Sequence, residues 1–259
     1  SHSQTLDMGD MGTIGFDQGT GAFGIGTIDD KMPTAYEEVW NGTTATTTDI
    51  LDANGGSAGV FGYKNTFMDT LVNIEYAPSV GSGDATDGGN SHVASVADGT
   101  SLNFALTNSS LMDGLTVGLG YGETTYDRAA GDVANIDTES TTGFFTYSIG
   151  AVTVGYQQSY TSGSVSAANT TIGANDVEMY GIAFNVNDAL SISYQDYDNT
   201  YKKRGSETGD GITQNASGIQ AAYTMGGATL RISDVSVDNS GGTSGNSEDR
   251  TEISLLMAF

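Results

Sequence analysis

The sequence predicts an all-β fold, a transmembrane antiparallel up-and-down β-barrel that forms one domain over residues 1–259. Three observations predict it. Apolar and polar residues alternate along many short segments. The joints between these segments are short and long in turn. The composition, with 37 glycines, 13 tyrosines and only 2 prolines, is typical of strands joined by turns rather than of helices packed on a leucine core.

Charge and composition exclude several classes of protein. A formal net charge of −24 with only 8 lysines and arginines argues against binding to nucleic acid, because phosphate contacts require basic side chains. The absence of cysteine excludes disulfides, thiol catalysis and thiolate metal sites. No apolar run reaches the roughly 18 residues of a membrane-spanning helix, so a membrane protein of this sequence would have to cross with strands.

The first element that we expect is a short strand over residues 11–16, followed by a long, Gly-rich and acidic segment over residues 17–58. We interpret the strand as pore wall and the segment as the loop that narrows the pore. At the other end, residues 252–259 have the length of one strand and finish on the aromatic Phe259, so we expect this strand to seal the wall.

Between these two ends, a period of two residues recurs from residue 59 onward. Apolar positions face one side, and polar or very small positions face the other, as expected for half-buried strands. The segments that show this alternation lie near 71–76, 102–107, 115–121, 145–149, 152–156, 180–186, 190–194, 219–223, 230–232 and 251–259.

The joints decide between a soluble sandwich and a membrane barrel, because alternation alone fits both. The short joints lie at 9–10, 68–70, 112–114, 150, 187–188 and 226–227. The long, polar joints lie near 17–58, 79–100, 125–138, 162–175, 202–213 and 239–248. Tight turns on one rim and long loops on the other are typical of barrels in the bacterial outer membrane.

The number of strands predicts a larger barrel. We count twelve strands between residues 11 and 259 and a partial one over 4–8, hence 12–13 strands in this sequence. Single-chain bacterial barrels have an even number of strands. We therefore expect three further strands upstream, which would complete a 16-stranded barrel.

Three stretches carry a family resemblance. The run Leu6-Asp7-Met8-Gly9-Asp10-Met11-Gly12-Thr13-Ile14-Gly15-Phe16 resembles the strand, tight turn and strand that lead into the constriction loop of the general, sixteen-stranded trimeric porins of Gram-negative bacteria. Gly62-Tyr63-Lys64-Asn65 resembles the strand that leaves that loop, and Phe259 is similar to the family's terminal aromatic residue. The Gly-Arg pair that often follows the second strand is replaced by Phe16-Asp17-Gln18, and the Pro-Glu-Phe tip of the loop is absent.

This resemblance implies a location, a function and a set of partners. The location is the bacterial outer membrane. The function is passive diffusion of small hydrophilic solutes and ions through a porin channel. The implied partners are outer-membrane lipid, lipopolysaccharide and two further copies of the chain in a homotrimer. The basic run 202–204 is where contact with lipopolysaccharide phosphates would be expected, although a solvated rim is the favoured explanation of this run.

The acidic part of the long segment is the predicted pore constriction, and its members are Asp29, Asp30, Lys31, Glu37 and Glu38. Carboxylates in a narrow aqueous constriction attract cations and repel anions, because low-dielectric walls focus their field. We therefore expect a cation preference. Ordinary solvated loop charge is the alternative explanation of the same residues.

Strand parity predicts which side chains face the lumen and which face lipid. The expected lumen lining is Lys64, Glu75, Gln157, Asn185, Gln195, Gln220, Arg231 and Glu252. The expected aromatic girdle at the membrane surfaces is Tyr76, Tyr121, Tyr147, Tyr156, Tyr194, Tyr223 and Phe259. Core packing is the alternative for each aromatic residue taken singly.

Two further motifs have simpler explanations. Residues 19–24 match the Gly-x-Gly-x-x-Gly pattern of dinucleotide sites, but no helical apolar period follows, so we expect a close-packed loop instead.

We expect neither a catalytic site nor a metal site. His92 near Asp84 and Asp87 is the only arrangement that would suit a barrel hydrolase.

The alternative function is a secreted or surface-displayed acidic β-sandwich adhesin with Ca²⁺-binding loops. We expect no cofactor; if Ca²⁺ binds, acidic loop residues would hold it, although they lack EF-hand or nonapeptide spacing. These residues are Asp132, Asp137, Asp210, Asp238 and Glu248.

Overall fold

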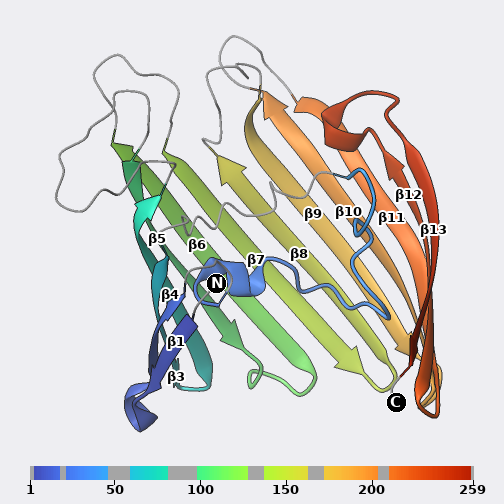
Figure 1. Cartoon of the computed structure of the whole chain (residues 1–259), viewed down its shortest axis with the longest axis horizontal. Coiled ribbons are helices and arrows are strands. Elements are labelled where there is room, and N and C mark those ends of the chain that lie inside the picture. Colours follow the sequence, from blue (N-terminus) through green and yellow to red (C-terminus); the bar gives the residue numbers. More distant parts are fainter. Residues whose placement is uncertain are drawn as a thin grey trace.

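The computed structural model describes residues 3–17, 22–45, 59–80, 98–127, 137–162, 172–203 and 210–257. These residues form one sheet of 13 strands in which each strand pairs with its neighbours in sequence (Figure 1). The strands are β1 Ser3–Asp7, β2 Thr13–Asp17, β3 Val60–Phe67, β4 Thr70–Val80, β5 Asp98–Asn108, β6 Leu115–Asp127, β7 Thr138–Ile149, β8 Val152–Ser162, β9 Ile172–Asn185, β10 Leu190–Lys203, β11 Asp210–Met225, β12 Ala228–Asp238 and β13 Glu248–Met257. Three short 3-10 helices accompany them, η1 Gly9–Met11, η2 Ile25–Ile28 and η3 Ser240–Gly242.

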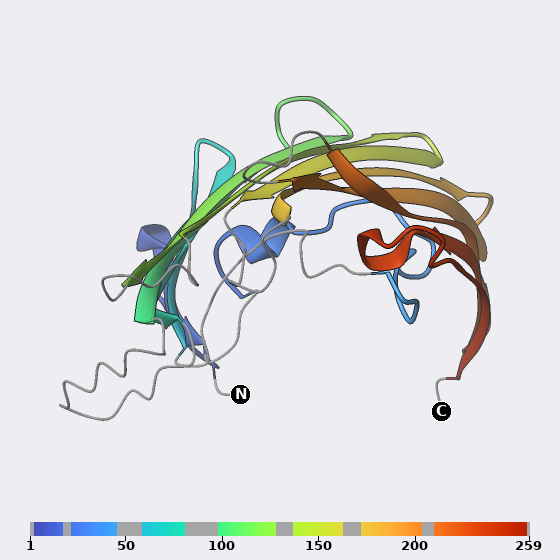
Figure 2. The ribbon, with the colours of Figure 1, turned by 90° about the horizontal axis from the view of Figure 1, so that it is seen from above.

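The predicted antiparallel, up-and-down order of strands is confirmed. Every neighbouring pair is antiparallel. The sheet curves into a trough, with β1 at one edge and β13 at the other (Figure 2). Because thirteen strands alternate in direction, β1 and β13 run the same way, and a direct pairing between them would be parallel.

The short joints lie on one rim of the sheet, and the strand ends that the long joints connect lie on the other rim. The short turns, such as Met68-Asp69 and Gly226-Gly227, gather at the lower rim in Figure 1, where β13 also ends. Left-handed backbone occurs in these turns, at glycines such as Gly114 and Gly226 and also at Met68. Among the described residues, no helix is long and apolar enough to cross a membrane.

Residues 22–45 cross the concave face of the trough (Figure 2). We call this stretch the inner segment. The largest buried apolar cluster lies between it and the wall, and comprises Met32, Val39, Val177, Met179, Tyr197, Ala216, Val235 and Val237, with Trp40 and Ala45 packed against it. The core of the described protein is therefore inside the trough, between the inner segment and the sheet.

Half-way along β9, β10 and β12, the apolar residues change from the convex face to the concave face. We call this change the inverted alternation. Near the short turns of β9, the exposed convex residues are apolar, such as Ile182 and Phe184. Further up the same strand, Val177 and Met179 are buried on the concave face, while Asp176 and Glu178 lie on the convex face. The wall thus has apolar residues outside in its lower half and inside in its upper half, where the inner segment covers it.

Candidate functional site

Near its start, the inner segment passes through a position that only glycine can occupy. Gly24 has a φ of 66°, and its amide donates to Asn73 Oδ1 at 3.0 Å. The next amide, of Ile25, donates to Asn103 Oδ1 at 2.7 Å. A Cβ on Gly24 would lie 1.8 Å from that same Asn103 oxygen. The Gly-x-Gly-x-x-Gly match therefore ends in a wall contact, and the helix that follows it, η2, has only 4 residues.

Wall glycines provide the room into which the first apolar residues of the segment fit. Phe23 lies over Gly15 and Gly62, where a Cβ would come within 2.5 Å and 1.9 Å of its ring. Ile25 lies over Gly120 in β6 in the same way. Both Phe23 and Ile25 are buried. Glycines in a strand commonly mark such a close approach.

Gln157 on β8 binds the backbone of residues 28–31 of the inner segment through both polar atoms of its side-chain amide. Its Nε2 donates to the carbonyl oxygens of Ile28 at 2.8 Å and Asp29 at 3.1 Å. Its Oε1 accepts from the amide of Lys31 at 3.0 Å. Gln157 is fully buried, and its contact with the Ile28 carbonyl is buried as well, so loss of this side chain would leave that carbonyl without a partner.

Gln195 on β10 repeats the arrangement further along. Its Oε1 accepts from the amide of Val39 at 3.1 Å, and its Nε2 lies within 3.5 Å of the carbonyl oxygens of Met32 and Pro33. A neutral amide can both donate and accept, so it satisfies N–H and C=O groups without burying a charge. Gln195 is therefore suited to fixing irregular backbone against the wall.

Gln220 on β11 is the third member of this series. Its Oε1 accepts from Thr34 Oγ1 at 2.6 Å and from the amide of Glu37 at 3.2 Å, and its Nε2 donates to the carbonyl oxygen of Glu37 at 2.5 Å. Beside it, Ser193 Oγ accepts from the amide of Ala35 at 2.9 Å. We call Asn73, Asn103, Gln157, Gln195 and Gln220 the amide ladder.

The far end of the segment is held by apolar packing. Trp40 lies against Tyr197, with ring centroids 4.9 Å apart, and Val39 is fully buried beside them. Beyond this point, the Thr44 amide donates to Glu248 Oε2 at 2.9 Å, and the Thr44 carbonyl accepts from Ser240 Oγ. Sequence reasoning did not find this docking site, although the inverted alternation of β9, β10 and β12 is a signal for it.

The five predicted constriction residues all lie on the inner segment. Glu38 accepts from Asn41 Nδ2 at 2.5 Å. Burial, reinforced by the negative charge of Glu38 and a hydrogen bond to it, raises the pKa of Asp30 to about 7. Burial also raises the pKa of Asp29 and of Glu37 above their ordinary values. The segment thus carries four carboxyl groups and Lys31, and Asp30 titrates near neutral pH.

The basic side chains described on the concave wall are engaged with the segment or with a carboxylate. Arg250 pairs with Glu252 at 2.6 Å, and Glu252 also accepts from Tyr36 Oη at 2.9 Å. Arg231 lies 5.2 Å from the centre of the Tyr36 ring. The Glu252 carboxylate therefore offsets the positive charge of Arg250, whereas Arg231 keeps its charge beside the Tyr36 ring.

The remaining predicted lumen residues differ in their surroundings. Lys64 Nζ is 5.9 Å from the centre of the Phe23 ring. Glu75 is buried and accepts from Asn103 Nδ2 at 3.2 Å through one oxygen. Gln157, Gln195 and Gln220 lie beneath the segment instead of on open lumen surface, because the backbone of the segment covers them. Asn185 is exposed at the lower end of β9.

The predicted girdle tyrosines lie on the convex face. Tyr76, Tyr194 and Tyr223 are exposed, and Tyr121, Tyr147 and Tyr156 are partly exposed. Phe259 lies outside the described residues.

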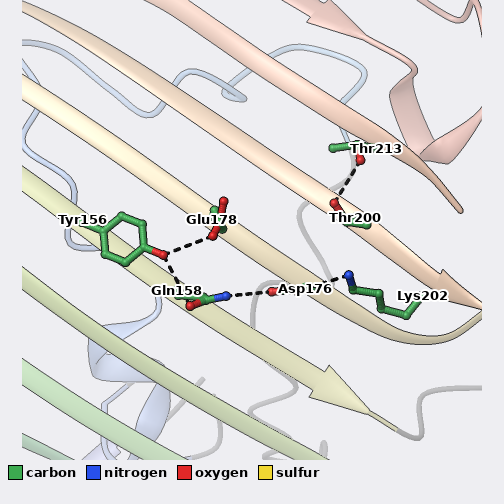
Figure 3. A network of polar contacts seen from close by, with 7 residues as sticks. All are labelled: Tyr156, Gln158, Asp176, Glu178, Thr200, Lys202 and Thr213. Atoms are coloured by element: carbon green, nitrogen blue, oxygen red, sulfur yellow. Dashed lines mark hydrogen bonds and ion pairs between the residues drawn. The ribbon is translucent and has the colours of Figure 1, made fainter. Parts of the chain in front are cut away.

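Several convex phenols donate to carboxylates just above them. Tyr156 Oη lies 3.2 Å from Glu178 Oε1, and Tyr194 Oη donates to Asp196 Oδ2 at 2.9 Å. Figure 3 shows the first of these contacts, together with the ion pair of 3.4 Å between Lys202 and Asp176. The convex wall therefore changes from apolar to carboxylate-bearing across a row of tyrosines.

The other predicted groups do not gather into a second site within the described residues. No group of three or more His, Cys, Asp or Glu side chains there is arranged to hold a metal ion. Asp238 accepts from Ser247 Oγ at 2.9 Å. The side chain of Asp210 lies outside the described part, as do His92, Asp84, Asp87, Asp132 and residue 204 of the basic run.

Comparison with solved structures identifies the fold. A porin matches with a TM-score of 0.61 at 16% identity, over 97% of this chain and 79% of the porin chain. An anion-selective porin from Comamonas acidovorans gives 0.61 at 12% identity, over 99% and 77% of the two chains. The loop L8 deletion mutant of OmpT, an outer membrane protein of Vibrio cholerae, gives 0.57 at 12% identity, over 96% and 76%.

No protein-family model matches the sequence, and a search of curated proteins finds no significant relative. The predicted resemblance to bacterial porins is confirmed at the level of the fold. The fold is that of proteins of the bacterial outer membrane, which is the predicted location.

Proposed function

We propose that the protein is an outer-membrane porin through which small hydrophilic solutes and ions diffuse passively. The observation that carries this proposal is the inner segment, which lies across the concave face of a porin-type wall and is held there by the amide ladder. A rigid polar segment across the lumen narrows a channel without closing it. Such a channel needs no cofactor.

We further propose that the channel prefers cations. Asp29, Asp30, Glu37 and Glu38 outnumber Lys31 on the segment, and the Arg250 charge is offset by its ion pair with Glu252. Carboxylates between low-dielectric walls raise the local concentration of cations. The similarity to an anion-selective porin does not carry over to this chain, because selectivity depends on the side chains in the lumen and not on the fold.

A channel requires a closed wall. An odd number of further antiparallel strands between β13 and β1 would close it, because the two edge strands run in the same direction. Three such strands would give the expected sixteen. We also propose a homotrimer in contact with outer-membrane lipid and lipopolysaccharide, and chemical cross-linking of the folded protein in detergent tests its subunit number.

The proposed function is tested in planar lipid bilayers with a tenfold gradient of KCl. The folded protein should form open channels whose reversal potential has the sign of cation preference. The combined variant Asp29→Asn, Asp30→Asn, Glu37→Gln, Glu38→Gln should lose most of this preference and still conduct. Absence of channels would contradict the porin proposal, and a reversal potential of the opposite sign would contradict cation preference alone.

A matched control carries the same change of charge on the convex wall. The variant Glu178→Gln, Asp196→Asn, Asp198→Asn, Asp234→Asn also removes four carboxylates, and all four lie on the outer face of β9, β10 and β12. It should leave the reversal potential nearly unchanged. An equal effect of the two variants would mean that net charge, and not the inner segment, determines selectivity.

The adhesin alternative is not supported. A β-sandwich needs two sheets that bury their apolar faces against each other. The described residues form one sheet, and its apolar convex residues, such as Leu119 and Ile219, are more than 60% exposed. Calcium binding by the acidic loops remains a separate prediction, which calorimetric titration of the folded protein with Ca²⁺ tests.

A further inference from the structure

The upper part of the concave wall carries two further amide side chains. Asn175 on β9 and Asn199 on β10 lie on the same face as the amide ladder, nearer to the rim of the long joints. Asn175 is 4% exposed, and Asn199 is fully buried. We call these two residues the upper amides. They belong to neither the predicted constriction nor the amide ladder.

Asn199 is enclosed on every side within the sheet. The strand register places it opposite Val177 on β9 and opposite Gln214 on β11. Tyr197 and Tyr201 flank it along β10 on the same face. All four neighbours are buried, and Val177 and Tyr197 belong to the apolar cluster beneath the inner segment. The polar atoms of Asn199 therefore lie among mainly apolar groups.

The 3-10 helix η3 covers this part of the wall. The amide of Gly241 donates to Gln214 Oε1 at 2.8 Å. Gly242 lies over the ring of Tyr201, where a Cβ would come within 2.6 Å of a ring carbon. The first residue of η3 also donates to the carbonyl oxygen of Thr44, so η3 and the far end of the inner segment form one cover. Figure 2 shows η3 on the concave side of the trough.

The upper amides lack partners beneath this cover. Within the described part of the chain, neither Oδ1 nor Nδ2 of Asn199 has a hydrogen-bond partner, and Oδ1 of Asn175 has none either. Four residues earlier on the same strand, Gln195 Oε1 accepts from the amide of Val39 at 3.1 Å. Buried amides without a partner are costly, and such groups in folded proteins commonly bind ordered water.

Side-chain length explains why Asn199 differs from Gln195. Asparagine is one methylene group shorter than glutamine, and Asn199 lies between two tyrosines that extend further from the sheet. Asn73 and Asn103 reach backbone because Gly24 allows the inner segment to approach the wall closely. At Asn199, the neighbouring rings keep the cover further from the wall.

We propose that internal water molecules bind the upper amides, and that one of them bridges Asn199 and Asn175. The two residues are diagonal neighbours on adjacent strands, because Asn199 lies opposite Val177. Such neighbours are roughly 7–8 Å apart, a separation that two side chains and one water molecule span.

Water fits the chemistry of these atoms. It donates to both Oδ1 atoms and accepts from Nδ2, and buried water typically makes about three hydrogen bonds to groups that would otherwise be unpaired. The far end of the inner segment thus rests partly on water, whereas its start is bound by direct contacts with the wall. This site does not depend on whether the protein conducts.

A crystal structure of the folded protein, at a resolution that reveals ordered water, tests the site directly. We expect electron density for water within hydrogen-bond distance of Oδ1 and Nδ2 of Asn199 and of Oδ1 of Asn175. Crystals of Asn199→Leu should lack the density at position 199. A protein atom bonded to the Asn199 amide, or empty space beside it, would overturn the proposal.

Urea unfolding in lipid vesicles provides a second test. Leucine has the branched shape of asparagine without its polar atoms, so in Asn199→Leu the amide and its water leave together and the midpoint should stay nearly unchanged. The control Gln195→Leu leaves the Val39 amide without its partner and should lower the midpoint. A loss in Asn199→Leu as large as in this control would mean a direct protein partner, and a clear gain would mean a dry amide; either result contradicts bound water.

Discussion

The concave and convex faces of β9, β10 and β12 both carry polar groups, but they use them in opposite ways. On the concave face, neutral amides such as Gln195 hold the backbone of the inner segment, and valines such as Val177 pack beneath it. On the convex face, carboxylates such as Glu178 accept from phenols and reach the surface. Charge therefore lies where water or headgroups are near, and uncharged amides lie where backbone must be covered.

The difference follows from the cost of burial. An amide side chain that meets both N–H and C=O groups leaves no orphan polar atom and no desolvated charge. A carboxylate in the position of Gln157 could accept from one backbone amide, but it could not donate to the carbonyl oxygens of Ile28 and Asp29. The ladder therefore depends on Asn and Gln specifically. Two predictions test this contrast between the two faces, and a third concerns the charge of the inner segment.

The largest effect is expected for Gln157→Leu, which leaves three backbone groups of the inner segment without partners. An unpaired buried group costs roughly 1–3 kcal/mol, and the Ile28 carbonyl is such a group, so the segment should detach from β8. Single-channel recordings should show rapid fluctuations between conductance levels that the parent protein lacks. Gln158→Leu, on the convex face of the same strand, should keep steady conductance; similar noise in both variants would refute the role of the ladder.

A smaller effect is expected for Val177→Ala, which removes two buried methyl groups between the inner segment and β9. At about 0.8 kcal/mol for each buried carbon, the variant should lose about 1–2 kcal/mol of folding free energy. Urea unfolding in lipid vesicles measures it. Val154→Ala, with the same chemistry on the convex face of β8, should lose less, and an equal loss would contradict the inverted alternation.

The smallest effect is a pH dependence of selectivity. Because burial and Glu38 raise the pKa of Asp30 to about 7, Asp30 is mainly neutral at pH 6 and mainly ionised at pH 8. Raising the pH through this range adds negative charge to the inner segment, so the cation preference should increase. Reversal potentials at pH 6 and pH 8 measure it, and Asp30→Asn should abolish most of the change. A preference that falls with rising pH would contradict the assignment.

Much of the wall could be predicted from local pattern. Tyr180, Ile182 and Phe184 alternate with smaller or polar neighbours, and short and long joints follow in turn, so strands, rims and the direction of many side chains follow from the chain alone. The exact ends of the strands could not be predicted, because they depend on hydrogen bonds between neighbouring strands. Met11, for example, belongs to the turn η1 and not to the strand that was expected to begin there.

The contacts of the inner segment could not be predicted in the same way. The backbone amide of Lys31 donates to the side chain of Gln157, which is 126 positions away in the sequence, and no local pattern indicates such a hydrogen bond. The inverted alternation on β12, where Val235 and Val237 face inward above Ile232, was present in the sequence. Its meaning depended on knowing that a distant segment covers that half of the wall.

The sequence by itself therefore determined the strands, the order of short and long joints and the acidic character of the inner segment, because each depends on neighbouring residues and on a period of two. Only the tertiary structure decided that Gln157, Gln195 and Gln220 lie under backbone, and that Asp30 and Glu38 interact. Burial and long-range hydrogen bonds arise when distant stretches of chain meet, and the curvature of the sheet brings them together.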